Sequence, residues 1–366
     1  MTEWKEYKLG EIVTFQRGHD LPKDKMIDGD IPVAGSNGII GYHNQFTKEG
    51  PGVTIGRSGN IGIPHYYPNA YWAHNTVLYI IDFKGNDTKF MYYLLKTFDF
   101  TQLNTGSAVP SLNRNHIHEL PVSIPDLPTQ QRIASILSSL DDKIDLLHRE
   151  NKTLEAMAET LFRQWFIEEA KEDWKEVLIT DLFEVKDGTH DSPKPQNFGY
   201  KLITSKYIHN NSIDFENAYS ISENDYITIN KRSKVETNDI LFSMIGTIGL
   251  IYLEENTQIN YAIKNIGLIK TSQNDVWKYF VYLWFKSEIG KDWIFENKTG
   301  STQEYISLTS LRNIKFRIKS IEQINQFNQL IEYYFKKIKI NKQQIQTLTQ
   351  QRDGLLPKLM SGEVKI

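Results

Sequence analysis

The chain has 366 residues, more than one hydrophobic core usually serves and enough for two domains with a connector. Its 40% hydrophobic and 24% charged residues are typical of a globular protein, and no apolar run approaches the roughly 18 residues that a membrane helix needs, so we expect a cytoplasmic protein without a membrane partner. The absence of cysteine excludes disulfides and thiolate metal sites, and a net charge of -3 means that any nucleic-acid contact must come from local basic patches or from a partner.

The first predicted domain opens on a segment that recurs near the middle of the chain. Residues 4–18 read WKEYKLGEIVTFQRG, and residues 174–188 read WKEVLITDLFEVKDG. The two segments share Trp-Lys-Glu, an aliphatic residue, an acidic residue, two apolar residues and a closing glycine. A repeat at this distance indicates duplication of a whole domain.

Further matches follow in the same order along both halves. Each half contains a Gly-x-Ile-Gly turn, an asparagine, an aromatic-rich helix, a Thr-Gly-Ser segment followed by Ser-Leu, and a short alternating apolar strand. The matched pairs are Gly59-x-Ile61-Gly62 with Gly246-x-Ile248-Gly249, Asn75 with Asn265, 89–96 with 279–286, Ser111-Leu112 with Ser307-Leu308, and 120–124 with 314–318. We therefore expect two similar α+β domains, with their length differences confined to loops at 190–201 and 230–237.

After each closing strand the apolar residues change to heptad spacing, which is typical of a coiled-coil seam. Each seam contains a polar residue near its middle, Asn151 or Asn341. Because an a position meets a d position across an antiparallel pair, we predict antiparallel helices with these asparagines in one layer and Trp165 near Phe327. The alternative is that each helix packs separately on its own domain. The seam positions are Ile133, Leu137, Leu140, Ile144, Leu147, Asn151, Leu154, Ala158, Leu161 and Trp165 in the first helix, and Ile324, Phe327, Ile331, Tyr334, Ile338, Asn341, Ile345, Leu348, Arg352, Leu355 and Leu359 in the second.

The sequence lacks the motifs of the nucleic-acid enzymes that it could be compared with. There is no methyltransferase cofactor loop or Asn/Asp-Pro-Pro-aromatic motif, and no phosphate-binding loop of an ATP motor. The nuclease-like triplets at 150–152 and 296–298 are interpreted as chance matches. His116 and His118 would face the same way on a strand, but they have no nearby carboxylate and no third ligand for a metal. We predict a binding protein with no catalytic residue, metal or cofactor of its own.

The chain resembles the specificity subunit of type I restriction-modification systems over essentially its whole length. The resemblance is carried by the two domains that open on Trp-Lys, by the GRSGNIG and IGTIG turns, and above all by LPTQQRIASILSSLDDKI at 127–144. It implies an α+β fold with two similar target-recognition domains in a pseudo-two-fold arrangement, separated by two long antiparallel helices that form a coiled coil. The expected divisions are a first target-recognition domain at 1–128, a first spacer helix at 129–170, a second target-recognition domain at 171–319, and a second spacer helix with the C-terminal tail at 320–366.

The resemblance also implies partners and chemistry that lie outside the chain. Each domain would bind one half of a split double-stranded DNA target, and two modification subunits would dock on the chain and methylate adenine with S-adenosylmethionine. Restriction subunits would add translocation and cleavage that use ATP and Mg. A stiff helical spacer implies a bipartite, asymmetric target with an unread gap, whose length should change when residues are inserted into or deleted from the helix at 133–165.

Direct reading of bases needs Arg, Lys, Asn, Gln or Ser at loop tips that can enter the major groove. The Gly-rich turn of the first domain is favoured because its small residues permit close approach. The predicted DNA-binding residues of the first domain are Arg17, Arg57, Ser58, Asn60, His74, Asn75, Ser107 and Arg114. Those of the second are Thr189, His190, Ser205, Lys206, Thr247 at the position that matches Asn60, and Lys231 and Arg232 in a basic loop.

Simpler interpretations stay open for these residues and for the chain. Gly59 and Gly62 could close a hairpin and nothing more, and Asn75 and Asn265 could cap or bridge strands. The chain could also be the recognition subunit of another restriction system, or a coiled-coil adaptor that holds two protein-binding domains and never binds DNA.

Overall fold

The structure is a computed structural model that describes residues 4–103, 111–209, 211–364 and 366. It divides into two compact units: unit 1 comprises Met1–Leu147 and Gln344–Ile366, and unit 2 comprises His148–Gln343. Two long helices, α4 (Leu127–Arg163) and α10 (Ile321–Met360), contribute to both units. No helix in the described part of the chain is long and apolar enough to cross a membrane.

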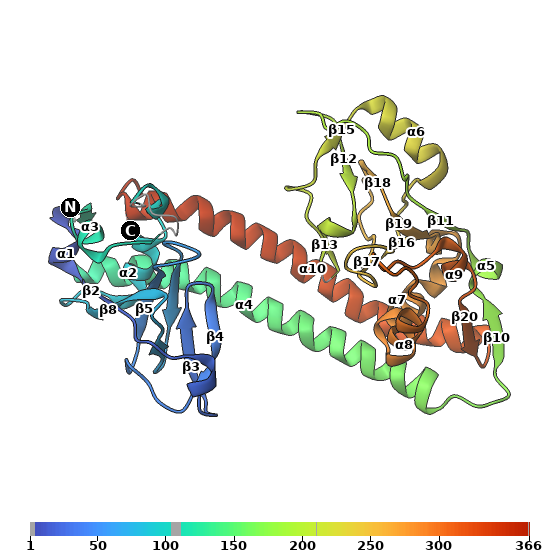
Figure 1. The fold of residues 1–366 in the computed structure, drawn as a ribbon, viewed down its shortest axis with the longest axis horizontal. Coiled ribbons are helices and arrows are strands. Elements are labelled where there is room, and N and C mark those ends of the chain that lie inside the picture. The colour runs from blue at the N-terminus through green and yellow to red at the C-terminus, as the bar shows by residue number, and fades with distance from the viewer. Residues whose placement is uncertain (1–3, 104–110, 210, 365) are drawn as a thin grey trace. The chain divides into compact units, whose positions relative to one another are not determined.

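Unit 1 contains a four-stranded sheet in the order β2-β8-β5-β6 and a three-stranded sheet in the order β4-β3-β7, in which β3 and β7 are parallel (Figure 1). Strands β1 and β9 form a separate antiparallel ladder. The elements are β1 Lys5–Lys8, α1 Leu9–Ile12, β2 Thr14–Arg17, β3 Ile31–Gly35, β4 Gly38–His43, β5 Gly52–Gly56, β6 Pro64–Tyr67, β7 Trp72–Ala73, β8 Val77–Asp82, α2 Thr88–Leu95, α3 Arg114–His118 and β9 Pro121–Ile124.

Unit 2 repeats this topology. Its four-stranded sheet has the order β11-β19-β16-β17, its three-stranded sheet has the order β15-β12-β18 with β12 and β18 parallel, and β10 pairs with β20. The duplication predicted from the sequence is therefore confirmed. The elements are β10 Lys175–Leu178, α5 Ile179–Leu182, β11 Val185–Asp187, β12 Tyr200–Ile203, β13 Ile208–His209, β14 Ser212–Ile213, β15 Ser220–Ile221, α6 Glu223–Ser233, β16 Ile240–Ser243, β17 Ile251–Leu253, β18 Tyr261–Ile263, β19 Ile266–Ile269, α7 Lys278–Lys286, α8 Glu288–Glu296, α9 Leu308–Arg312 and β20 Lys315–Ile318.

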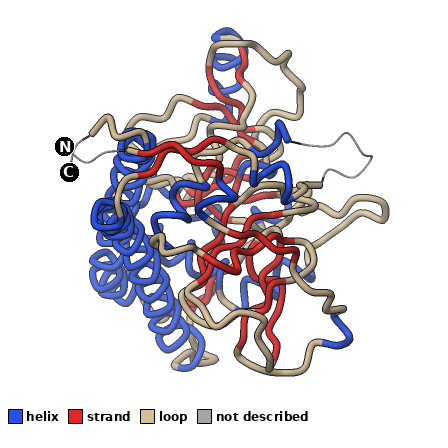
Figure 2. Tube along the Cα trace, turned by 90° about the vertical axis from the view of Figure 1, so that its left-hand side faces the viewer, coloured by secondary structure: helices blue, strands red, loops and turns tan. Residues whose placement is uncertain are grey.

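The strands are short, as Figure 2 shows in red, and apolar helices supply much of each core. Asp87 caps α2 by accepting from the Phe90 N–H at 2.8 Å, and the aromatic residues that follow are largely buried. In α7 every residue from 279 to 285 is buried. Both aromatic-rich helices predicted from the sequence are confirmed, and their rings are core packing rather than exposed stacking surfaces.

The long helices pair in antiparallel fashion inside each unit. In unit 2 Asn341 Nδ2 donates to Asn151 Oδ1 at 2.9 Å, and the ring centroids of Trp165 and Phe327 lie 5.8 Å apart. The register is constant, because 165 minus 151 and 341 minus 327 are both 14. In unit 1 Arg352 donates to Asp141 at 2.8 Å. The predicted seam, direction and asparagine layer are confirmed, and separate packing of the helices is excluded.

The asparagine layer yields a stability prediction. Asn341 is fully buried, and its Nδ2 donates to both Asn151 and the half-exposed Glu150. Asn341→Leu alone should lower the free energy of unfolding by roughly 1–3 kcal/mol, because Asn151 loses its buried partner. The double variant Asn151→Leu/Asn341→Leu should recover most of that loss, since two apolar residues need no partner.

Urea unfolding of the full chain measures these changes, with the exposed Lys152→Leu as a control that should stay within about 0.5 kcal/mol. The single variant Asn151→Leu completes the set, and if the losses in the two single variants simply add in the double variant, the two side chains are not coupled.

Three expectations from the sequence are wrong in the structure. The segment at 230–237 is not wholly a loop: Lys231 and Arg232 lie in the last turn of α6, where cations favour the helix dipole and Ser222 caps the other end. His116 and His118 lie on helix α3, not on a strand. The third correction concerns the Ser-Leu match. Leu112 N–H donates to Arg57 and Ile306 N–H donates to Met244, so Ser111-Leu112 is equivalent to residues 305–306 and not to Ser307-Leu308.

The division of the chain at residues 128, 170 and 319 stays a prediction, because the compact units do not follow those limits. Parts of both long helices belong to each unit. Ile133 and Leu137 of α4 share a buried cluster with Leu359 and Met360 of α10 in unit 1. The C-terminal residues are therefore part of the core of the N-terminal domain.

Candidate nucleic-acid interface

Three loop segments meet at one end of the four-stranded sheet of unit 1. The segment after β2 is tied to the β7–β8 turn, since Gly18 N–H donates to Val77 at 3.0 Å and His19 N–H donates to Ala73 at 2.8 Å. The β5–β6 turn joins the same group, because Arg57 N–H donates to Thr76 at 2.8 Å. These backbone bonds hold the three segments in one cluster, which we call the first reading cluster: 17–20, 57–60 and 74–76.

Gly18 permits this convergence. A Cβ at Gly18 would lie 2.0 Å from the carbonyl oxygen of His74, which no real side chain tolerates. In unit 2 a Cβ at Gly188 would lie 2.4 Å from the carbonyl oxygen of Ile263. The backbone therefore approaches closely at equivalent places in the two units, and glycine is required at the end of each repeated opening segment because it has no Cβ.

The Gly-rich turn between β5 and β6 closes a hairpin, as the simpler interpretation held. Gly59 and Gly62 have φ values of +82° and +76°, and Gly62 N–H donates to Gly56 at 2.7 Å. In unit 2 Gly249 N–H donates to Ser243 at 3.0 Å in the equivalent bond. The same turn leaves Asn60 exposed and Ser58 partly exposed, so its structural role does not exclude a binding role.

Polar contacts organise the side chains of the first reading cluster. Asp20 accepts from Arg17 at 3.4 Å and also from the side chain of Asn75. Arg57 Nη1 donates to the Asn75 carbonyl at 3.4 Å. Burial lowers the pKa of His74, which favours the neutral imidazole and a hydrogen-bonding rather than a phosphate-pairing role. Five predicted residues, Arg17, Arg57, Ser58, His74 and Asn75, thus lie in one cluster, with Asn60 at its turn.

The remaining first-domain residues differ in their placement. Arg114 is exposed at the start of α3, two residues after Leu112, which donates to the Arg57 carbonyl at 2.9 Å. Arg114 is therefore close to the cluster along the chain, without a contact that makes it part of the cluster. Ser107 lies outside the described residues.

In unit 2 two of the three equivalent segments, at 245–247 and at Asn265, line an open hollow of about 550 Å³. Ser205, Lys206 and Thr247 line it, and all three were predicted from the sequence. Asn265 and Gln303 also line it, and neither was among the predicted binding residues. The Ser205 hydroxyl is buried, and no described residue forms a hydrogen bond with it.

Several linked polar and charged contacts lie next to this hollow. His190 Nε2 lies 2.9 Å from Asp187 Oδ2, and Arg232 forms an ion pair with the other oxygen of the same carboxylate. Thr189 is tied to the same turn, because Asn265 N–H donates to its carbonyl at 3.1 Å. Lys231 is exposed on α6 and does not line the hollow. The structure therefore gathers every predicted residue of the second domain except Lys231.

The sequence interpretation missed the two carboxylates that hold these clusters together. Asp20 and Asp187 flank the repeated glycines Gly18 and Gly188, and each accepts hydrogen bonds from predicted binding residues. Their closeness to the repeated glycines was a usable signal. A search for cationic and amide side chains overlooks acids that orient them.

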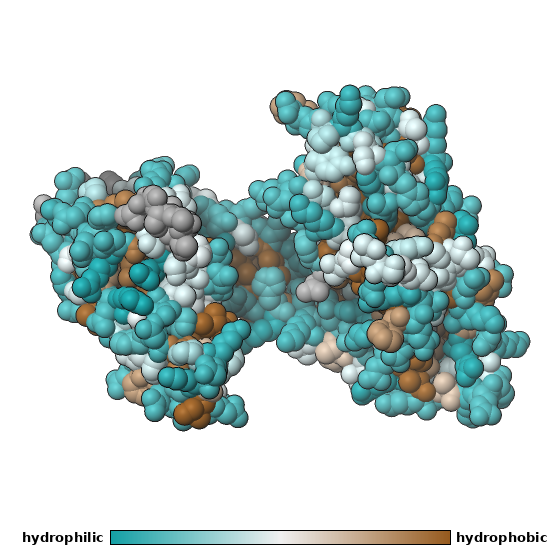
Figure 3. All heavy atoms as spheres, in the orientation of Figure 1, coloured by the Kyte–Doolittle hydropathy of each residue, from teal (hydrophilic) through white to brown (hydrophobic). Residues whose placement is uncertain are grey.

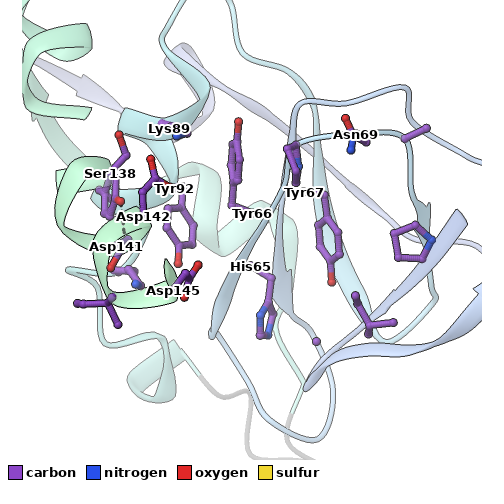
Figure 4. A pocket seen from close by; sticks show the side chains of 18 of the residues that line it. His65, Tyr66, Tyr67, Asn69, Lys89, Tyr92, Ser138, Asp141, Asp142 and Asp145 are labelled. Atoms are coloured by element: carbon purple, nitrogen blue, oxygen red, sulfur yellow. Dashed lines mark hydrogen bonds between the residues drawn. The ribbon is translucent and has the colours of Figure 1, made fainter. Parts of the chain in front are cut away.

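Another hollow, of about 990 Å³, lies in unit 1, and none of the predicted DNA-binding residues lines it. Figure 4 shows Asp141, Asp142 and Asp145 on one side of it and the rings of Tyr66 and Tyr67 on the other. Four aspartates and three cations, Lys89, Lys96 and Arg352, line it, so its charge does not mark it as a site for a phosphate backbone. Within the described residues no group of three or more acidic or histidine side chains is arranged to hold a metal.

Comparison with known proteins gives one family. The sequence profile of the type I restriction modification DNA specificity domain matches residues 1–156 and 171–350. The MjaIX type I restriction enzyme specificity subunit of Methanocaldococcus jannaschii is 26% identical over 321 residues, which cover 78% of this chain and 71% of that protein. The MjaVIII specificity subunit of the same organism is 21% identical over 304 residues, with coverage of 76% and 71%.

A solved structure shares the fold. The S subunit of the type I restriction-modification system from M. genitalium matches with a TM-score of 0.65 at 16% identity, and the match covers 98% of this chain and 96% of that one.

Two copies of one α+β domain, each with polar loop ends gathered beside a small sheet, define a duplicated recognition protein. The family profile matches both copies and together the two matches cover most of the chain. The chain belongs to the type I restriction-modification DNA specificity family, and its role in the restriction-modification complex is the non-catalytic recognition of the DNA sequence.

Proposed function

We propose that each unit reads one half of a bipartite, asymmetric DNA target through its loop cluster, and that the paired helices set the length of the unread gap. The observation that carries this proposal is the repetition of one backbone arrangement with different side chains on it. Arg57 is replaced by Met244, Asn60 by Thr247, and Asp20 by His190 at equivalent positions. Similar backbones with different donors and acceptors read different bases.

The side chains in these clusters suit base edges in the major groove. Asn and Gln can pair with adenine, Arg and Lys with guanine, and hydroxyls with either kind of base. The candidates are Arg17, Arg57, Ser58, Asn60, His74, Asn75 and Arg114 in the first unit, and Thr189, His190, Ser205, Lys206, Arg232 and Thr247 in the second. Lys231, exposed on α6 away from the hollow, is assigned to the phosphate backbone.

The outer faces of the long helices support docking of two modification subunits. Several large apolar side chains that do not belong to the seam are exposed, among them Leu146 and Met157 on α4 and Tyr333 and Ile340 on α10. Their exposure leaves apolar area on both long helices that a protein partner can cover. Such partners, acting in the cytoplasm, would supply adenine methylation from S-adenosylmethionine, and restriction subunits would supply the chemistry that uses ATP and Mg.

Outside these exposed apolar side chains, much of the surface is polar. The face in Figure 3 is mostly hydrophilic, with brown residues in small separate groups. The binding of DNA by the loop clusters therefore depends on hydrogen bonds and local cations, because the net charge of -3 gives no general attraction to phosphate.

The experiment that tests the proposal is duplex binding by the full chain purified with its modification partner. The complex should bind a duplex with its own target at least about a thousandfold more tightly than a scrambled duplex. Arg57→Ala should weaken binding to the target by about 1–3 kcal/mol and relax the preference at one position of the first half-site.

Lys5→Ala removes one exposed positive charge from β1 and serves as the control, since it should leave the preferred sequence unchanged. A wild-type complex that binds all duplexes alike would refute the proposal and favour the adaptor alternative. An unaltered first half-site in Arg57→Ala would remove Arg57 from the reading residues.

A further inference from the structure

Residues 20 and 190 occupy equivalent positions, each two residues after the glycine that closes the repeated opening. The bridges His19–His74 and Thr189–Lys264 place each of these segments beside the turn that carries the matched asparagine, Asn75 in unit 1 and Asn265 in unit 2. Each residue contacts the asparagine of its own unit through the side chain. The two contacts use opposite ends of the asparagine amide.

In unit 1 the amide nitrogen of Asn75 points to Asp20. An ionised carboxylate only accepts hydrogen bonds, so Asn75 must donate through Nδ2. Arg17 pairs with the same carboxylate at 3.4 Å. No described residue donates to Asn75 Oδ1. Asn75 therefore presents a free acceptor.

In unit 2 the amide oxygen of Asn265 points to His190. Asn265 Oδ1 lies 2.8 Å from His190 Nδ1, and since an amide oxygen only accepts, Nδ1 donates. His190 Nε2 lies 2.9 Å from Asp187 Oδ2, and Arg232 pairs with the other oxygen of that carboxylate. The side chain of His190 is 66% exposed, while that of Asp187 is 6% exposed.

This arrangement leaves the other end of Asn265 available. No described residue accepts from Asn265 Nδ2, and Asn265 lines the same hollow as the unpaired hydroxyl of Ser205. Asn265 has a φ of +54°, a left-handed conformation that asparagine tolerates better than most residues. That conformation accounts for an asparagine at this position, but not for the direction in which its amide points.

We infer that residues 20 and 190 are positioning residues, which determine whether the equivalent asparagine offers the DNA an acceptor or a donor. Asn75 offers Oδ1, which suits the N4 amino group of cytosine or the N6 amino group of adenine. Asn265 offers Nδ2, which suits the accepting edges of guanine and thymine or the N7 of adenine. Asn265 becomes a specificity-determining residue of the second half-site. This inference rests on the proposed function of the loop clusters.

The test replaces His190 by the residue of the first unit, in the full chain purified with its modification partner. In His190→Asp the new carboxylate accepts from Asn265 Nδ2, and the amide turns so that Oδ1 faces the DNA. Arg232 stands close enough to Asp187 to balance the second negative charge. Selection from a duplex library randomised in both half-sites should show, at one position of the second half-site, a rise of roughly fivefold to tenfold in cytosine relative to guanine and thymine.

Two further variants make the outcome decisive. Asn265→Asp keeps the hydrogen bond from His190 and presents only oxygen, so it should shift the same position in the same direction. Asn265→Gly keeps the left-handed conformation without a side chain and should leave that position without preference. The first half-site should remain unchanged in all three variants.

The results separate this inference from the proposed function. A wild-type complex without a bipartite target refutes the proposed function. A wild-type complex that reads its target normally, with His190→Asp leaving the cytosine ratio unchanged or Asn265→Gly keeping the preference, overturns the inference alone. Uniform loss of the whole second half-site in His190→Asp, with thermal unfolding unchanged, also overturns it, because an orienting residue affects one position.

Discussion

Inserting one heptad into each long helix, after Leu147 in α4 and after Gln343 in α10, is expected to lengthen the unread gap of the target by about three base pairs. Seven residues add about 10 Å of helix at ~1.5 Å per residue, and one base pair occupies about 3.4 Å. A whole heptad keeps every seam residue in phase with its partner, so the helices should still pair. Both half-sites should stay the same, because the loop clusters are untouched.

Methylated-base mapping of a host that carries the variant measures the gap and the half-sites together. A matched control inserts two residues at the same two places, which at about 100° per residue rotates the seam by roughly 200° and should abolish methylation by disrupting helix pairing. Altered half-sites with an unchanged gap would contradict the proposal that the helices act as the spacer.

Gly18→Ala is expected to abolish reading of the first half-site, and Gly188→Ala reading of the second. The added Cβ meets a backbone carbonyl oxygen in each case, and backbone cannot move aside as the tip of a flexible side chain can. The loop segments that converge there must separate, which should reduce binding to the target by at least about a hundredfold, or roughly 2.7 kcal/mol. Each variant should leave the other unit folded, because the clash lies inside one loop cluster.

Gly354→Ala is the matched control. A Cβ at Gly354 meets nothing within 4 Å, and the residue lies inside α10, so alanine should stabilise the helix by about 0.5–1 kcal/mol and leave binding unchanged. Duplex binding and thermal unfolding distinguish the three variants. If Gly18→Ala retains full discrimination at the first half-site, the first reading cluster does not contact that DNA.

The sequence predicted the structure best where a regular pattern of residue types has a single physical cause. Heptad spacing predicts a buried seam, and Asn151 and Asn341 in two apolar seams predicted a shared layer because each needs a polar partner inside it. The repeated Gly18 and Gly188 helped to predict the duplication, and the structure gives the reason for both glycines, since a Cβ at either position would meet a backbone carbonyl oxygen. These features depend on local pattern, and the structure confirms them.

Features that depend on contacts between loops were harder to predict. The basic run that includes Lys231 and Arg232 has the composition of a loop, but Ser222 at one end and Ile229 on its buried side make it helical. The Ser-Leu match was based on residue identity alone, whereas the backbone hydrogen bonds to Arg57 and Met244 define which residues of the two units are equivalent.

The carboxylates of the loop clusters show a second limit of sequence reasoning. Asp187 holds Arg232 from 45 positions away along the chain, and no spacing rule joins two loops at that distance. Which residues touch DNA stays a prediction, because no contact within the chain can test it.

The discontinuity of unit 1 governs the order in which a newly made chain can acquire structure. Leu359 and Met360 complete the cluster around Ile133 and Leu137, yet more than two hundred residues are synthesised between them. Unit 2 is continuous from His148 to Gln343 and can fold once that stretch has been synthesised. Unit 1, in contrast, lacks part of its apolar core until residues beyond Gln343 have been made. Completion of unit 1 therefore depends on residues that are synthesised after unit 2, and until then the cluster around Ile133 and Leu137 lacks part of its packing.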